Sequence, residues 1–300
     1  MPKFSIIIPT YNRKELLKKA IESVVNQDFK DYEIIVVNDG GEDVKEIINS
    51  FNNKNIKLIQ YSLNKGLPYA KNLGVKYTKN EWIIFLDDDD EIVNNSLSKL
   101  SEFIKEDLWY VTPRLYVVNN KFFINPSYKK LLYFYKNPIK SLDIRKFPFG
   151  GSILNIKIFE KFHFDENIFY GEDYEFYFRL VKSNIKFTPL NVVYYKYHFK
   201  ILEKNFGKLL KDREYILEKH FNNFDKENLS IFYFHLSKIS KKSGNLYKAL
   251  KYIYKGFIVQ PNIKSFINTL LYLFLLILPR KWIIFLEKQF TKTGLRFLLF

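Results

Sequence analysis

The sequence of 300 residues contains no cysteine. Disulfide bonds, thiolate metal sites and cysteine nucleophiles are therefore excluded, and any metal ion must be held by oxygen or imidazole ligands. Long Gly/Ser/Pro tracts are also missing, and 47% of the residues are hydrophobic, so we expect a folded chain. A chain of this length can form one α/β domain of about 200 residues followed by a small helical part.

Targeting and membrane-spanning segments are not evident either. The N-terminus leads directly into a strand-like segment and shows none of the features of a signal peptide, so we expect the protein to stay in the cytoplasm. The apolar run at residues 266–278 is shorter than the roughly 20 residues that cross a bilayer. We therefore do not expect it to span the membrane alone.

Acidic residues are scarce in the last quarter of the chain. From Asn228 onward there are twelve lysine and arginine residues and one acid, Glu287, and this segment accounts for most of the net charge of +16. Basic charge beside apolar runs is typical of a segment that lies in the plane of an anionic membrane. We predict an α/β domain at residues 1–227 and a helical, membrane-associating region at residues 228–300. The protein would then be peripheral at the inner face of the cell membrane. The alternative is a helical hairpin that packs on the first region.

Strand-like and helical patterns alternate over the first 90 residues. This alternation predicts an α/β fold with a parallel, doubly wound sheet, in which ligands bind beyond the carboxyl ends of the strands. Polar clusters at residues 9–12, 38–41 and 87–90 all follow predicted strands, and they mark a candidate site. The predicted strands are residues 5–9, 33–37, 56–60 and 82–86, and the helices between them are residues 13–26, 44–52 and 67–77.

Later elements follow a less regular pattern. We predict strands at residues 109–118 and 121–124, a turn at Gly150 and Gly151, and an amphipathic helix at residues 172–183. The C-terminal region is predicted to contain helices at residues 231–240, 246–259 and 264–278.

Four consecutive aspartates, residues 87–90, follow a predicted buried strand. In an extended segment residues i and i+2 point the same way, so Asp87 and Asp89 converge, and hard carboxylate oxygens suit Mg²⁺ or Mn²⁺. The alternative is a solvated acidic turn or a helix cap. We favour a metal site because four adjacent acids repel one another unless a cation is bound.

Several segments together resemble the family-two glycosyltransferases with the GT-A fold. The motifs are Ser5-Ile-Ile-Ile-Pro-Thr-Tyr-Asn, Val37-Asn-Asp39-Gly, Asn64-Lys-Gly66 through Ala70-Lys-Asn72, Phe85-Leu-Asp-Asp-Asp-Asp90, Gly171-Glu172-Asp173, and Tyr195 to His198. The resemblance covers about residues 3 to 200. It implies a GT-A fold, Rossmann-like and mostly parallel, followed here by the helical, basic and apolar appendage.

The resemblance also implies an activity and a donor site. It implies an inverting transfer of a sugar from a nucleotide-diphosphate donor, with uridine favoured and guanosine open, and a divalent cation that neutralises the leaving diphosphate. Asp39 is expected to accept a hydrogen bond from the base, and Asp89 and His198 to hold the metal. The implied donor-binding residues are Pro9, Tyr11, Asp39, Asn64, Gly66, Lys71, Asp87 and Asp88.

On the acceptor side, the resemblance implies that Asp173 is the general base that deprotonates the attacking hydroxyl. The helix that begins there keeps the carboxylate ionised through its dipole, although capping alone is the alternative role. Glu172, Gly150 and Gly151 are expected to line the acceptor side. Family members that polymerise processively carry Gln-x-x-Arg-Trp, which is missing here, so we expect a single transfer per encounter.

Two other functional classes remain as alternatives. A sequence pI of about 9.5 and abundant Tyr and Phe would suit a nucleic-acid-binding protein, but such a protein has no use for four aspartates at a strand end. The second alternative is a catalytically inactive sugar-nucleotide-binding scaffold, because a fold alone does not establish activity. We therefore predict as partners a nucleotide-sugar donor, a glycan or lipid-linked acceptor and an anionic membrane surface, and no nucleic acid.

Overall fold

The computed structural model describes residues 3–118, 121–143, 151–198 and 205–262, together with residues 267, 269, 270 and 273. The chain divides into two compact units, residues 1–139 with 148–202, and residues 140–147 with 203–300. The predicted boundary after residue 227 falls inside the second unit, and the membrane role of residues 228–300 stays a prediction. Within the described residues, no helix combines the length and hydropathy needed to cross a membrane.

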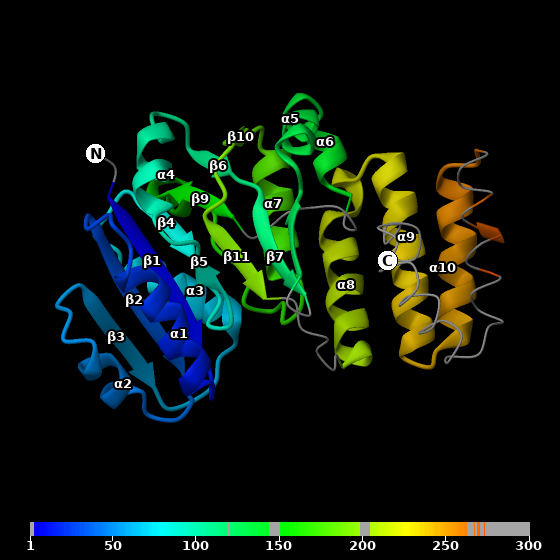
Figure 1. The fold of residues 1–300 in the computed structure, drawn as a ribbon. Helices are drawn as coiled ribbons and strands as arrows, with labels where there is room; N and C mark the ends of the chain where they lie inside the picture. The colour runs from blue at the N-terminus through cyan, green and yellow to red at the C-terminus, as the bar shows by residue number, and fades with distance from the viewer. Residues whose placement is uncertain are drawn as a thin grey trace. The chain divides into compact units, whose positions relative to one another are not determined.

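A seven-stranded sheet forms the centre of the first unit, in the order β10-β6-β9-β4-β1-β2-β3 (Figure 1). Strand β9 runs antiparallel to both of its neighbours, and the other pairs are parallel, as the alternating pattern predicts. The strands are β1 (Phe4–Thr10), β2 (Tyr32–Asp39), β3 (Ile56–Tyr61), β4 (Trp82–Phe85), β6 (Trp109–Val111), β9 (Ser152–Asn155) and β10 (Thr188–Pro189).

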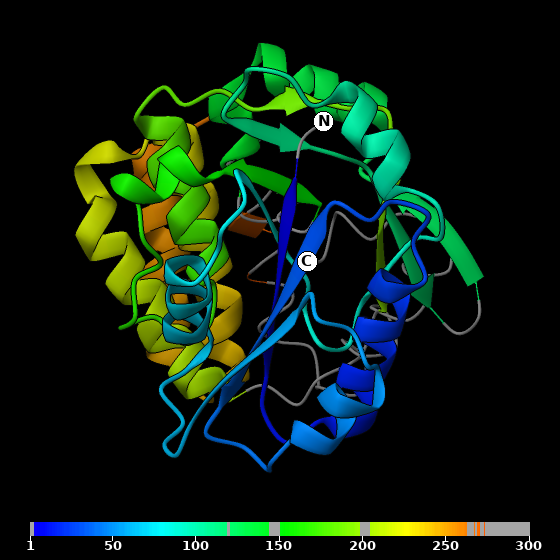
Figure 2. The same cartoon turned by 90° about the vertical axis from the view of Figure 1, so that its left-hand side faces the viewer.

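Helices cover both faces of this sheet, which confirms the doubly wound architecture. In Figure 2, α1 and α2 lie on one side of the strands and α3 lies on the other. Strands β1, β2 and β4 are rich in Ile and Val and are buried on both faces, as expected for a sheet between two helical layers. The helices of this part of the chain are α1 (Lys14–Val25), α2 (Lys45–Ser50), α3 (Leu67–Lys76), α4 (Leu97–Phe103), α5 (Tyr128–Lys136), α6 (Pro138–Ser141) and α7 (Glu172–Lys182), with a 3₁₀ turn, η1 (Ile156–Glu160).

A second, four-stranded sheet lies in the first unit, in the order β5-β11-β7-β8. The predicted strand at residues 109–118 is divided between the two sheets, because β6 ends before Pro113, whose ring leaves no N–H for a sheet ladder. The strands of this sheet are β5 (Glu91–Ile92), β7 (Arg114–Val118), β8 (Lys121–Asn125) and β11 (Tyr195–His198).

The second unit is helical among its described residues. Helices α8 (Phe206–His220), α9 (Lys226–Lys242) and α10 (Leu246–Val259) pack in sequence, α8 on α9 and α9 on α10, and η2 (Phe221–Asn223) follows α8 (Figure 1). Each long helix begins after an Asn or Asp whose side chain accepts a hydrogen bond from a main-chain N–H of the first turn. Helices were correctly predicted at residues 231–240 and 246–259, whereas α8 was missed. The predicted helix at residues 264–278 lies mostly outside the described residues.

Candidate active site

A pocket of about 420 Å³ opens at the carboxyl ends of β1, β2 and β4. This is the position where an open α/β sheet binds ligands. Thr10, Arg13 and Gly171 line the pocket together with most of the residues that the sequence singles out. These predicted lining residues are Pro9, Tyr11, Asp39, Asn64, Gly66, Asp87, Asp88, Asp89, Glu172 and His198.

The four aspartates form a turn and not the extended segment that the sequence analysis predicts. The N–H of Asp90 donates to the carbonyl of Asp87 at 3.0 Å, which closes the turn directly after β4. The expectation that Asp87 and Asp89 converge through strand alternation is therefore wrong. Local hydrogen bonding ends the strand before its pleat reaches these residues, yet Asp87, Asp88 and Asp89 all still line the pocket.

Asp88 is held in place by Thr10 of the N-terminal motif and by Arg13, the residue that follows this motif. The hydroxyl of Thr10 donates to one carboxylate oxygen at 2.8 Å, and Arg13 binds the other at 2.9 Å. Arg13 also lies 3.6 Å from the carboxylate of Asp89. Burial raises the pKa of Asp88, while the contacts with Thr10 and Arg13 oppose this shift. Neither Thr10 nor Arg13 was assigned a role in the site from the sequence, although Thr10 lies between Pro9 and Tyr11 and Arg13 lies two residues after Tyr11.

Lys71 and Asp173 are not among the described residues that line the pocket, but Lys71 contacts Glu172, which is. The buried ammonium group of Lys71 binds Glu172 at 3.0 Å and Asp173 at 2.7 Å. Burial alone would lower the pKa of Lys71, but the negative charges of Asp173 and Glu172 raise it well above its usual value. Lys71 therefore stays charged and orients both carboxylates. Its predicted contact with the donor diphosphate stays a prediction.

Negative charge is concentrated next to this lysine. Burial raises the pKa of Glu172, and Lys71 opposes the shift. Loss of solvent likewise raises the pKa of Asp87, Lys71 opposes this shift, and the negative charges of Asp173 and Asp89 add to it. A bound cation would relieve this repulsion between carboxylates.

Asp39 organises the loop that follows β3. One of its carboxylate oxygens accepts hydrogen bonds from the Tyr61 hydroxyl at 2.8 Å and the Lys65 N–H at 2.7 Å, and the other accepts from the Gly66 N–H at 2.8 Å. Gly66 has φ of +94°, a conformation that favours glycine. Asp39 thus fixes the loop that carries Asn64 and Gly66, in addition to lining the pocket.

The fourth aspartate and His198 are linked to each other. Buried Asp90 accepts hydrogen bonds from the Tyr195 hydroxyl and the His198 N–H, each at 2.8 Å, and burial together with the charge of Asp87 raises its pKa. The imidazole Nε2 of His198 lies 2.6 Å from the carboxylate of Glu91. Burial would raise the pKa of Glu91, but Lys196 and His198 together lower it. His198 lines the pocket, and its ring nitrogen already contacts the Glu91 carboxylate. Its predicted role as a metal ligand stays a prediction.

The two predicted glycines have different outcomes. Gly150 lies outside the described residues. Gly151, at the turn before β9, has φ of +83°, and a side chain there would meet Thr112 and Arg114. It is not among the described residues that line the pocket, so its predicted place on the acceptor side stays a prediction.

The residues present fit a divalent cation that the donor helps to bind. Among the described residues, no group of three or more His, Asp or Glu side chains is arranged to hold a metal ion. Mg²⁺ is commonly held by one or two carboxylates together with substrate phosphates, and Asp87 and Asp89, which line the pocket, would be such carboxylates. When bound, the cation would neutralise the charge of a leaving diphosphate.

Comparison with known proteins identifies the family to which the chain belongs. The sequence model of glycosyl transferase family 2 matches residues 5–162. A curated relative from Campylobacter jejuni, named GalNAc(5)-diNAcBac-PP-undecaprenol beta-1,3-glucosyltransferase, is 43% identical over 111 residues, which are 35% of this chain and 36% of that relative. The match therefore spans well under half the length of the relative.

Solved structures share the fold of the chain at low sequence identity. A fragment of TarS from Staphylococcus aureus in complex with UDP-GlcNAc has a TM-score of 0.61 at 21% identity, covering 90% of this chain and 79% of that chain. Mannosyltransferase PcManGT from Pyrobaculum calidifontis, in complex with GDP-Man and Mn²⁺, has a TM-score of 0.58 at 12% identity, covering 94% and 83%. The strand-end motifs, the family match and these folds agree: the chain belongs to glycosyl transferase family 2 and has the GT-A fold.

Proposed function

We propose that the protein is an inverting glycosyltransferase that moves a sugar from a nucleotide-diphosphate donor to a hydroxyl group of a glycan or lipid-linked acceptor. One observation carries this proposal: a single pocket at the strand ends gathers the donor-side residues of three separate motifs with the aspartate turn and Glu172. Asp173, the neighbour of Glu172, shares the same lysine.

The donor half of the pocket has the chemistry that a nucleotide diphosphate requires. The loop that Asp39 holds and residues 9–11 would contact the base and ribose, and Asp87 and Asp89 would provide oxygen ligands for Mn²⁺ or Mg²⁺ beside the diphosphate. We favour a uridine donor because the neighbour with the higher TM-score holds UDP-GlcNAc. A guanosine donor is the alternative, since the other neighbour holds GDP-Man.

Asp173 is the proposed general base. It lies in the first turn of α7, where the helix dipole favours a carboxylate, and Lys71 holds one of its oxygens at 2.7 Å. Its side chain is 37% exposed, so an acceptor hydroxyl can approach it. Asp173 would take the hydroxyl proton as the oxygen attacks the anomeric carbon. Attack from the face opposite the leaving diphosphate inverts that centre.

The acceptor is proposed to be membrane-linked. The name of the Campylobacter relative includes an undecaprenol-linked diphosphate, and residues 228–300 of this chain carry twelve basic residues against one acid. We infer that the protein works as a peripheral protein at the inner face of the cell membrane and transfers one sugar per encounter. Electrostatic attraction to anionic lipids supports this location.

The role of Asp173 can be tested by sugar transfer or donor hydrolysis over a panel of nucleotide sugars with Mn²⁺, Mg²⁺ or EDTA. We expect Asp173→Asn to bind the donor as the wild type does and to lose turnover by about 10²- to 10⁴-fold, the usual contribution of a general base. Asp43→Asn, a change at an exposed acid, serves as the control. Wild-type turnover by Asp173→Asn would show that Asp173 only caps α7. Donor binding without turnover in the wild type would favour the inactive scaffold.

A further inference from the structure

Helix α10 has two apolar faces, and one of them is already used. Ala249, Ile253 and Gly256 are buried on the side of the helix that packs along α9. At Gly256 the helices approach so closely that an added Cβ would lie 3.2 Å from the ring of Phe234, and the Ser230 hydroxyl donates to the Gly256 carbonyl. A helix on the surface of a soluble domain needs only one such apolar stripe.

The second apolar face is exposed. Leu246, Leu250, Tyr254 and Ile258 recur every four residues, so they form one row along the helix. Their exposed fractions are 55%, 50%, 66% and 53%, and that of neighbouring Tyr247 is 77%. A row of large exposed apolar side chains of this kind marks an interaction surface.

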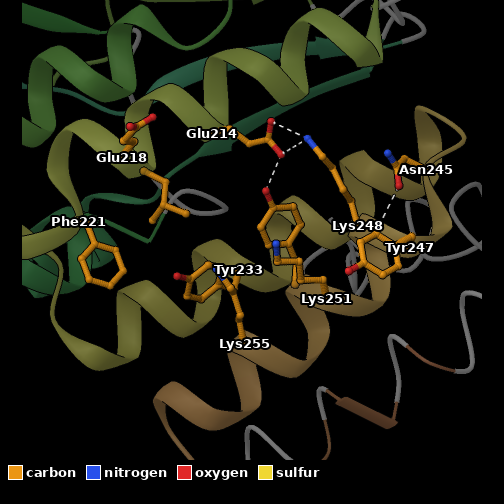
Figure 3. Close-up of a pocket in the computed structure, with 11 residues that line it drawn as sticks. Glu214, Glu218, Phe221, Tyr233, Asn245, Tyr247, Lys248, Lys251 and Lys255 are labelled. Atoms are coloured by element: carbon orange, nitrogen blue, oxygen red, sulfur yellow. Dashed lines mark hydrogen bonds and ion pairs between the residues drawn. The ribbon is translucent and has the colours of Figure 1, made fainter.

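Lysines border this row on one side. Lys251 and Lys255 lie one turn apart on α10, and no acidic residue is present in the helix. Within the described part of the chain, neither lysine forms an ion pair, although Lys255 lies 5.5 Å from the centre of the Tyr233 ring. Lys248 differs, because it binds the carboxylate of Glu214, as Figure 3 shows. The same carboxylate also accepts a hydrogen bond from the Tyr252 hydroxyl.

We propose that the exposed face of α10 is the surface through which the protein binds an anionic lipid bilayer. The apolar row enters the boundary between headgroups and acyl chains, and Lys251 and Lys255 meet the lipid phosphates. The inference deepens the membrane location proposed above and rests on it. Charge favours lipid over a second copy of the chain, since pairing two α10 faces would bring lysines against lysines.

Vesicle flotation of the full chain tests this surface. The vesicles contain either phosphatidylcholine alone or a mixture with phosphatidylglycerol. We expect the wild type to float only with the anionic vesicles, and Lys251→Gln/Lys255→Gln to bind about thirtyfold more weakly, at about fivefold per lysine. Leu250→Glu/Tyr254→Glu should abolish flotation. The controls are Lys18→Gln/Lys19→Gln on α1 and Phe103→Glu on α4, all at exposed positions, which should float as the wild type does.

Thermal unfolding and light scattering identify other occupants of the face. Wild-type flotation by both α10 variants overturns the proposal, as does a wild type that binds neither vesicle. Unchanged flotation with a lower melting temperature would show that the chain itself covers the face, and a change from dimer to monomer would show a second copy. Turnover of a soluble nucleotide sugar, measured without vesicles, should be the same in all variants. If the wild type floats but does not turn over any nucleotide sugar, the proposed activity is contradicted, whereas the proposed membrane-binding surface is not.

Discussion

At the scale of single residues, Lys71 is a buried positive charge shared by two carboxylates. It binds Glu172 and Asp173 across about a hundred residues of sequence, and it lies beside the strongly acidic turn after β4. A lone buried charge is costly, whereas a paired one is tolerated. The arrangement therefore ties the orientation of the proposed base to the integrity of helix α3.

Replacing Lys71 with methionine leaves buried Glu172 without a counter-charge. We expect Lys71→Met to lower the free energy of unfolding by about 3 kcal/mol, as when one partner of a buried ion pair is removed. Adding Glu172→Gln should restore part of that loss, so the two changes are not additive. Urea denaturation of the single and double variants measures the coupling. Lys76→Met, at an exposed position of the same helix, is the control, and equal stability of the two lysine variants would contradict the ion-pair role.

The residues of the site could be predicted better than their partners. Pro9, Tyr11, Asp39 and the aspartates were found because they follow strands, and parallel strands bring their carboxyl ends to one edge. The contact of Tyr61 with Asp39 and that of Tyr195 with Asp90 could not be predicted. Such side-chain contacts join distant segments and leave no local pattern in the sequence.

At the scale of elements, the packing of α3 against β1 depends on a glycine. A Cβ built on Gly74 would lie 2.4 Å from the Cγ2 methyl of Ile7, a group fixed at the branch of its side chain. The close contact between α3 and β1 therefore requires a residue without a side chain at position 74. The same helix carries Lys71, so the distance between α3 and β1 also sets the position of the ammonium group.

Overpacking at Gly74 should destabilise the first unit. We expect Gly74→Ala to lower the free energy of unfolding by about 1–3 kcal/mol, because the steric cost exceeds the gain of about 1 kcal/mol in helix propensity. Gly207→Ala in α8 is the matched control, since its Cβ meets only an ordinary contact at 3.4 Å and the change should be neutral or stabilising. Chemical denaturation followed by circular dichroism compares them. A stabilised Gly74→Ala protein would show that α3 shifts freely on the sheet.

The elements of the first 90 residues could be predicted because each strand is a short apolar run between polar turns. The antiparallel insertion of β9 between β4 and β6 could not, because the order of strands in a sheet is set by tertiary packing. The aspartate turn was mispredicted for a related reason. A main-chain hydrogen bond from Asp90 to Asp87 ends the extended conformation, and the side chains alone do not reveal it.

At the scale of the whole molecule, the family and the fold agree with the motifs, while the substrates are still proposals. The first unit supplies the pocket and the second supplies a basic helical region with an exposed apolar row. These features suit an enzyme that meets a soluble donor and a membrane-linked acceptor. Of these two substrates, the donor can be tested directly, by measuring nucleotide binding to the pocket.

The most direct measurement is calorimetric titration of the wild type and Asp89→Ala with UDP, GDP and their sugar conjugates, in Mn²⁺ and again in EDTA. We expect one nucleotide to bind the wild type only when the cation is present, because carboxylates and diphosphate share it. Asp89→Ala should lose this binding, while Asp43→Asn should retain it. Nucleotide binding that is equal in Mn²⁺ and EDTA and unaffected by Asp89→Ala would contradict the metal-assisted donor site, and no binding of any nucleotide would contradict the proposed function itself.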